Sequence, residues 1–114
     1  MPYLMIQTNQ SLDANASKSL LAEASKLVAA ELGKPENYVM VALEADVPML
    51  FAGSDDPLAY LELKSIGLPE SKTTALSAAL CGLIENATGI SQDRIYIEFA
   101  DAPRAMWGWN GATF

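Results

Sequence analysis

The chain has 114 residues, of which 51% are hydrophobic and 18% are charged, and its net charge at pH 7 is −7. This composition is too apolar for a disordered chain, and the length suffices for a single domain over residues 1–114 with its own core. The negative charge opposes binding to phosphate backbones and anionic lipid. Neither nucleic acid nor a membrane is therefore an expected partner.

The first half of the chain predicts a strand, a helix and a second strand. Residues 3–7 form an apolar run directly after Met1 and Pro2, and a proline that begins a strand loses no ladder hydrogen bond. Ser11 or Asp13 can cap a helix over about 13–32, with Gly33 as its stop. The alternation over 38–44 then predicts a strand.

The second half predicts the same order of elements. A turn at 53–57 leads to a strand over 58–66, and a helix follows from Gly67 to a stop at Gly89. Gly82 inside this helix indicates a close backbone approach. A strand is predicted over 94–100, and the following Trp107–Gly111 segment is too rich in glycine and aromatics for a solvated tail.

An internal repeat connects the two halves, because residues 33–43 align without gaps on residues 89–99, an offset of 56. Two split β-α-β units therefore predict an α+β (α/β) fold, in which a mixed four-stranded sheet carries two helices on one face. The other face would carry Met40, Ala42, Leu58, Tyr60 and Tyr96, interrupted by Glu62, Lys64 and Glu98. Such a face suits neither water nor a dry core, so we expect further copies of the chain to cover it.

The residue types limit the chemistry. With no histidine and a single cysteine, Cys81, the chain has neither an internal disulfide nor a nucleophile activated by histidine, and no metal or cofactor site is predicted. Proton carriers are then carboxylates, lysines, tyrosines or a terminal amine. No basic segment followed by an apolar one marks a signal peptide, so a cytoplasmic location is the expected default, with leaderless export left open.

Several short motifs occur in order along the whole chain: Met1-Pro2, Gly33-Lys34-Pro35, Ser65-Ile66-Gly67, Leu80-Cys81-Gly82-Leu83, Asp93-Arg94-Ile95-Tyr96-Ile97 and Gly108 through Phe114. Taken singly, Pro2 can simply begin a strand and Lys34 can be a cation at a helix C-terminus. Taken together, the motifs resemble the macrophage migration inhibitory factor and D-dopachrome tautomerase family of the tautomerase superfamily.

The resemblance implies a homotrimeric isomerase that interconverts keto and enol forms of aromatic α-keto acids such as phenylpyruvate without a cofactor. The amine of Pro2, freed by removal of Met1, would be the base. The other implied roles are substrate-oxygen binding by Lys34 and the Ile66 backbone, a contribution from a neighbouring subunit by Tyr96 and Glu98, and an apolar wall of Trp107, Trp109 and Phe114. Burial and the Lys34 charge would both lower the pKa of the amine into the range where a base works.

Three departures from the family pattern affect the function. Leu58-Ala59-Tyr60-Leu61 stands where the cytokine members carry Cys-x-x-Cys, Glu98 replaces an asparagine, and Trp107 replaces a smaller aliphatic residue. Two alternatives to the enzyme stay open: a cytokine-like protein ligand with an incidental pocket, and a trimer that binds small molecules without catalysis. Only the enzyme requires a free Pro2 amine.

Overall fold

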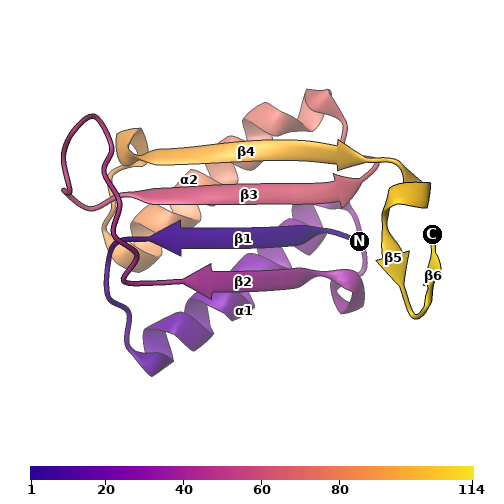
Figure 1. Ribbon diagram of the computed structural model, residues 1–114, viewed down its shortest axis with the longest axis horizontal. Coiled ribbons are helices and arrows are strands. Elements are labelled where there is room, and N and C mark those ends of the chain that lie inside the picture. The colour runs from indigo at the N-terminus through magenta and orange to yellow at the C-terminus, as the bar shows by residue number, and fades with distance from the viewer.

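The computed structural model describes residues 1–114 and has a four-stranded sheet with both long helices on one face (Figure 1). The elements are β1 (Tyr3–Thr8), α1 (Ala14–Leu32), β2 (Met40–Glu44), β3 (Ala59–Ile66), α2 (Thr73–Thr88) and β4 (Ile95–Ala102). The strand order is β2-β1-β3-β4, with β1 parallel to β2, β3 parallel to β4, and β1 antiparallel to β3. The predicted fold of two β-α-β units is therefore confirmed.

The helix boundaries follow from their caps. The Asp13 side chain accepts a hydrogen bond from the Ala16 N–H at 2.7 Å, which makes Asp13 the N-cap of α1. Helix α1 ends at Gly33, whose φ of +63° is the left-handed conformation that glycine adopts without strain. Helix α2 ends at Gly89 as predicted, but it begins only at Thr73, because Pro69 is extended and a 3-10 turn over Glu70–Lys72 comes first.

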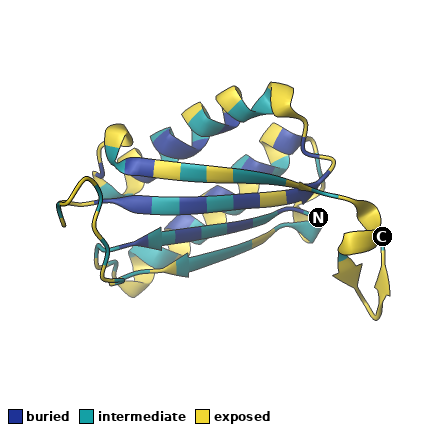
Figure 2. Ribbon diagram, turned by 45° about the horizontal axis from the view of Figure 1, so that its top comes forward, coloured by how far each residue is buried: buried dark blue, intermediate teal, exposed yellow.

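The core lies between the sheet and the helices, where alternate residues of β1 and β3 are buried (Figure 2). Its helical side is made at matching positions of the two units, Leu20, Ala24 and Val28 in α1 against Leu76, Leu80 and Ile84 in α2. The opposite, open face presents Tyr96 and Met40 at 65% and 66% exposure, as predicted. Leu58 is the exception to the predicted open face, since it is only 2% exposed.

One local prediction was wrong. A Cβ placed on Gly82 would meet no atom within 4 Å outside its own helix backbone, so this glycine marks no close backbone approach.

The C-terminal segment folds into a small hairpin of β5 (Gly108–Trp109) and β6 (Ala112–Thr113), which follows a 3-10 turn over Arg104–Met106. It lies beyond the N-terminal end of β1 (Figure 1). The Trp109 and Phe114 rings stack at 5.7 Å, and Tyr38 meets both edge-on, so aromatic contacts tie the hairpin to the start of β2. No helix is long and apolar enough to cross a membrane.

Candidate active site at the start of strand β1

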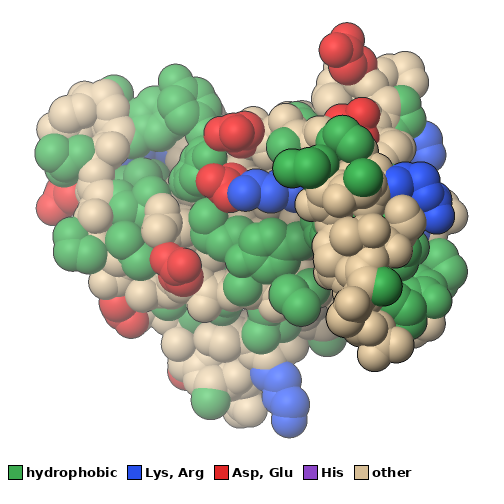
Figure 3. Space-filling model, turned by 45° about the vertical axis from the view of Figure 1, so that its right-hand side comes forward, with side chains coloured by type: hydrophobic (Ala, Val, Ile, Leu, Met, Phe, Trp, Pro, Cys, Tyr) green, Lys and Arg blue, Asp and Glu red, His purple; other side chains and the backbone are tan.

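A cavity of about 470 Å³ opens at the start of β1, within the range of small-molecule sites. Eight of its eleven lining residues are hydrophobic, and they come from three parts of the chain: Met1 to Tyr3, Asn37 to Met40, and the C-terminal residues Trp107, Gly108, Trp109 and Phe114. Figure 3 turns this end of the molecule forward and shows hydrophobic side chains gathered over the sheet face beside it. The cavity therefore suits an apolar, ring-sized ligand.

Pro2 is buried and lines this cavity, and it directly follows Met1. Its carbonyl accepts a hydrogen bond from the Met40 N–H at 3.0 Å, which continues the β1–β2 ladder by one residue. Burial, followed by the positive charge of Lys34, lowers the pKa of the Met1 terminal amine below its ordinary value of 8.0. An amine at this end of β1 is thus biased toward its neutral form.

Lys34 is held both at its backbone and at the tip of its side chain. Its backbone N–H donates to the Ala29 carbonyl at 3.0 Å, beside the Gly33 N–H bond to Ala30, so the end of α1 fixes its Cα. Its Nζ donates to the Ile66 carbonyl at 2.8 Å. Because Tyr3 pairs with Lys64 across β1 and β3, the end of β3 lies beside the start of β1. Lys34 and Ile66 do not line the cavity. The Lys34 charge nevertheless lowers the pKa of the Met1 terminal amine, which lies at the cavity.

The aromatic wall contains one residue that sequence reasoning missed. Trp107, Trp109 and Phe114 line the cavity, and Tyr38 joins them. Tyr38 was predicted to begin a strand, whereas it ends a 3-10 turn that starts at Glu36, after the extended Pro35. The proline two residues after Gly33 was the available signal for a turn at this point.

Tyr96 and Glu98 lie away from Pro2 in this chain. Strand β4 runs with β3 and against β1, so the start of β4 is at the opposite end of the sheet. Tyr96 there lines a second cavity, of about 480 Å³ and entirely hydrophobic, and its ring is 4.6 Å from that of Phe51. Arg94, another residue without a predicted role, holds this region by donating to the Phe51, Ser54 and Asp56 carbonyls. One copy of the chain does not bring the predicted site residues together.

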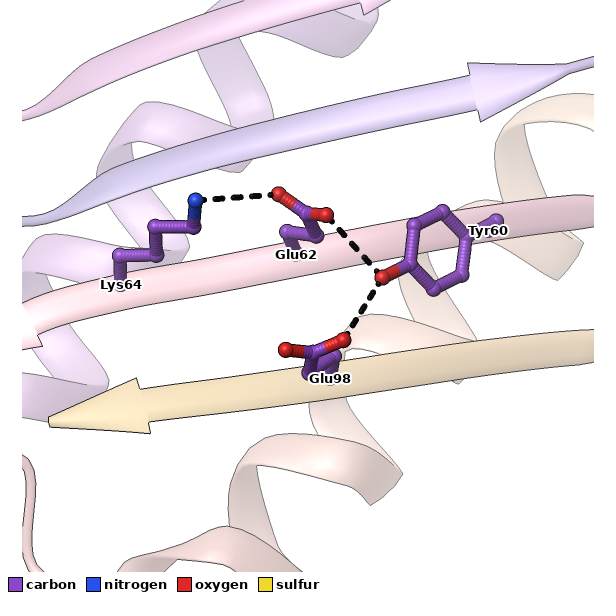
Figure 4. A network of polar contacts seen from close by, with 4 residues as sticks. All are labelled: Tyr60, Glu62, Lys64 and Glu98. Atoms are coloured by element: carbon purple, nitrogen blue, oxygen red, sulfur yellow. Dashed lines mark hydrogen bonds and ion pairs between the residues drawn. The ribbon is translucent and has the colours of Figure 1, made fainter.

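Glu98 belongs to a polar network in the middle of the open face (Figure 4). The Tyr60 hydroxyl lies 3.0 Å from a Glu98 carboxylate oxygen and 3.1 Å from one of Glu62, and the Lys64 Nζ is 3.4 Å from Glu62. Partial burial and these two carboxylates raise the pKa of Tyr60 to about 12. Glu98 is therefore held by the Tyr60 hydroxyl. No group of three or more acidic or cysteine side chains is placed to hold a metal ion.

Comparison with known proteins agrees with the fold. The sequence profile described as macrophage migration inhibitory factor (MIF) matches residues 1–114. A homologue of that factor from Brugia malayi is 40% identical, with 100% of this chain and 99% of the relative covered. The crystal structure of a homologue from Prochlorococcus marinus is 50% identical and superposes with a TM-score of 0.93, with 98% of each chain covered.

A further solved structure, of a protein inactivated by 2-oxo-3-pentynoate, is 30% identical with a TM-score of 0.87, and the match covers 97% of this chain and 95% of the other. The chain belongs to the macrophage migration inhibitory factor family of the tautomerase superfamily.

Proposed function

We propose that the chain is a cofactor-independent keto–enol tautomerase, an isomerase of aromatic α-keto acids such as phenylpyruvate. The observation that carries the proposal is a buried proline at position two, placed at an aromatic-lined cavity within the field of Lys34. The relative inactivated by 2-oxo-3-pentynoate adds support, because that compound is itself a 2-oxo acid.

The reaction needs a neutral amine and a stabilised oxyanion. Once Met1 is removed, the Pro2 nitrogen takes the proton next to the substrate carbonyl, the electron pair moves onto the carbonyl oxygen, and protonation of that oxygen completes the enol. In this proposal the substrate's acid and carbonyl oxygens extend beyond the cavity lining toward the end of β3, where Lys34 and the Ile66 backbone bind them. The Lys34 charge stabilises the carbonyl oxygen as it becomes negative. Trp107, Trp109 and Phe114, together with Tyr38, hold the aromatic ring.

A homotrimer completes the site in this proposal. The open sheet face is covered by neighbouring copies, and each copy brings Tyr96 and Glu98 to the Pro2 cavity of the next. Two observations support it: Tyr96 is 65% exposed in the single chain, and it lines an entirely hydrophobic cavity at the opposite end of the sheet from Pro2. Both ends are apolar surfaces that need a partner.

The test combines an intact-mass measurement with a phenylpyruvate tautomerase assay on the same sample. We expect the active sample to lack Met1. A sample whose Pro2 nitrogen is blocked, by retained Met1 or by a chemical cap, is the matched control and should be inactive. Fully processed protein that leaves phenylpyruvate and related keto acids unchanged would overturn the proposal and favour a binding protein or a protein ligand.

A further inference from the structure

The Lys34 ammonium depends on one backbone carbonyl. Its Nζ donates to Ile66 at 2.8 Å, and no carboxylate lies within ion-pair distance of it. A free lysine side chain samples many rotamers, so the direction of the Ile66 carbonyl decides where this charge lies. Ile66 is the last residue of β3, and the chain turns immediately after it.

The turn at Ile66–Leu68 is held at several points. Gly67 has a φ of +68°, the left-handed conformation that a side chain would strain. Leu68 is only 6% exposed, which fixes the turn to the core through its side chain. The Leu68 backbone N–H donates to the Asp101 carboxylate at 3.0 Å. These points together set the plane of the peptide groups between Ile66 and Leu68.

Asp101 comes from a different strand, at a sequence separation of 33. It lies in β4 opposite Ser65, and the next residue, Ala102, lies opposite Ile66. Asp101 is itself exposed, and the single ion pair of the structure, between Lys64 and Glu62, does not involve it. The hydrogen bond to the Leu68 N–H is the one hydrogen bond of its side chain, and bonds to a charged acceptor are stronger than those between neutral groups.

We propose that Asp101 is a positioning residue for Lys34. By holding the Leu68 N–H it keeps the turn in the conformation that aims the Ile66 carbonyl at the Lys34 ammonium. Asp101 itself is not among the residues that line the cavity. Its role in catalysis rests on the proposed function, whereas its effect on the position of Lys34 does not.

Two substitutions at Asp101 separate the hydrogen bond from the charge. Asp101→Ala removes both, and Asp101→Asn removes the charge but keeps an oxygen that can accept from Leu68. We expect Asp101→Ala to lower kcat/KM by about 10-fold or more, since small misplacements at a site cost up to about 10²-fold. Asp101→Asn should stay within a few fold of the wild type. Asp13→Ala is the matched control, because it also removes a carboxylate that accepts a backbone N–H, at the α1 N-cap away from the cavity, and should leave kcat/KM unchanged.

A double-mutant cycle tests whether Asp101 acts through Lys34. In a Lys34→Ala background, Asp101→Ala should cost no further activity, because the group that it positions is gone. Independent losses that multiply in the double variant would overturn the inference. So would Asp101→Asn being as impaired as Asp101→Ala.

A measurement without substrate keeps the inference separate from the proposed function. NMR titration of the Pro2 amine should give a higher pKa in Asp101→Ala than in Asp101→Asn, because a loosened Lys34 charge lowers the amine pKa less. Equal amine pKa values in the two variants would overturn the inference even in an active enzyme. A wild type without tautomerase activity would overturn the proposed function and leave this comparison intact.

Discussion

The two β-α-β units share a scaffold and differ at the positions that carry chemistry. Both helices end at a left-handed glycine, Gly33 and Gly89, and the next residue is Lys34 in the first unit but Ile90 in the second. Pro2 precedes β1, and the buried residue at the matching place of β3 is Ala59. Ile90 and Ala59 are 0% and 1% exposed members of the core. The same backbone thus supports a packed core in one unit and a candidate base with its cation in the other.

The open face shows the reverse difference. There the second unit carries the charged network of Tyr60, Glu62 and Glu98, and the matching residues of the first unit include the apolar Met5 and Ala42. In the proposed function the catalytic base and its cation lie in the first unit, whereas the polar network of the open face lies in the second. Substitutions that make one unit like the other test this division.

The largest effect is expected from Pro2→Gly. A rigid secondary amine should be a better placed base than a flexible primary one, and general-base catalysis contributes about 10²–10⁴-fold. We expect kcat/KM for phenylpyruvate to fall by about that factor. Sedimentation should show that assembly is unchanged. Wild-type rates in this variant would remove Pro2 from the mechanism.

Lys34→Ile copies the second unit into the first. Loss of one donor to a developing oxyanion typically costs about 10²–10³-fold in kcat, so a loss in that range is expected. The positive charge of Lys34 lowers the pKa of the terminal amine, so its removal should raise that pKa and move the acid limb of kcat/KM to higher pH. Lys72→Ile, a lysine near the start of α2, is the control and should change neither value. An acid limb that does not move in Lys34→Ile would contradict the electrostatic coupling.

The sequence was sufficient for the fold because its strongest signals are local. Helical spacing, the stops at Gly33 and Gly89 and the repeat at an offset of 56 residues all recur in the structure. The first strand of each unit, β1 and β3, is the exception to this offset. Their buried residues match at an offset of 57, namely Leu4, Ile6 and Thr8 with Leu61, Leu63 and Ser65. From the strand to the matching helix position the second unit is one residue shorter, Ser65 to Leu76 against Thr8 to Leu20, and a one-residue slip exchanges the two faces of a strand. A gapless alignment of one segment could not show this.

The site was less predictable than the fold because its contacts join distant parts of the chain. The motifs named Pro2 and Lys34 as candidate site residues. Periodicity, however, contains nothing that joins Asp101 to Leu68 or the Tyr60 hydroxyl to Glu98, which are separated by 33 and 38 residues. Tyr38 was assigned to a strand because its neighbours alternate, and only the packing of the C-terminal hairpin shows that it belongs to the aromatic wall.

Mixing experiments test the two ends of the sheet. We test whether Tyr96 serves the cavity of a neighbouring copy by mixing Pro2→Gly chains with Tyr96→Ala chains. An intact site then needs Pro2 from a Tyr96→Ala chain and Tyr96 from a neighbouring Pro2→Gly chain, so random trimers should recover about one quarter of the sites. Trimers of Pro2→Gly and Lys34→Ala chains should recover none, because both residues serve the same chain. The opposite pattern would place the interface elsewhere on the sheet.

Glu98→Gln makes the second unit more like the first by removing a carboxylate from the open face. In the proposed trimer Glu98 reaches the Pro2 cavity of a neighbouring copy, where its negative charge favours the protonated amine. Its removal should therefore lower the acid-limb pKa of kcat/KM, by less than about one unit in a partly wet pocket. Glu62→Gln removes a carboxylate from the same network and is the comparison variant. An acid limb that stays within about 0.2 units in Glu98→Gln, where one unit is 1.36 kcal/mol, would place Glu98 outside the catalytic electrostatics.

The smallest effect concerns the Tyr60 hydroxyl. The open face of the first unit has no carboxylates at the positions that match Glu62 and Glu98, so this network exists only in the second unit. Its pKa is raised from 10.0 to about 12, because partial burial and the carboxylates of Glu98 and Glu62 favour the neutral hydroxyl. A group whose pKa is raised by folding stabilises the fold fully below its unfolded pKa, and that contribution disappears as pH rises through the folded value. The contribution of Tyr60 should therefore be complete below about pH 10 and lost toward pH 12.

Thermal unfolding of the wild type and Tyr60→Phe measures this contribution. The wild type should have the higher Tm at pH 9, by a few degrees at most, and the gap should shrink at pH 11.5. The other three tyrosines are present in both proteins, so their titration cancels in the difference. A gap that is constant across this pH range would show that the hydroxyl gains nothing from Glu62 and Glu98, and that the network drawn in Figure 4 does not contribute to stability.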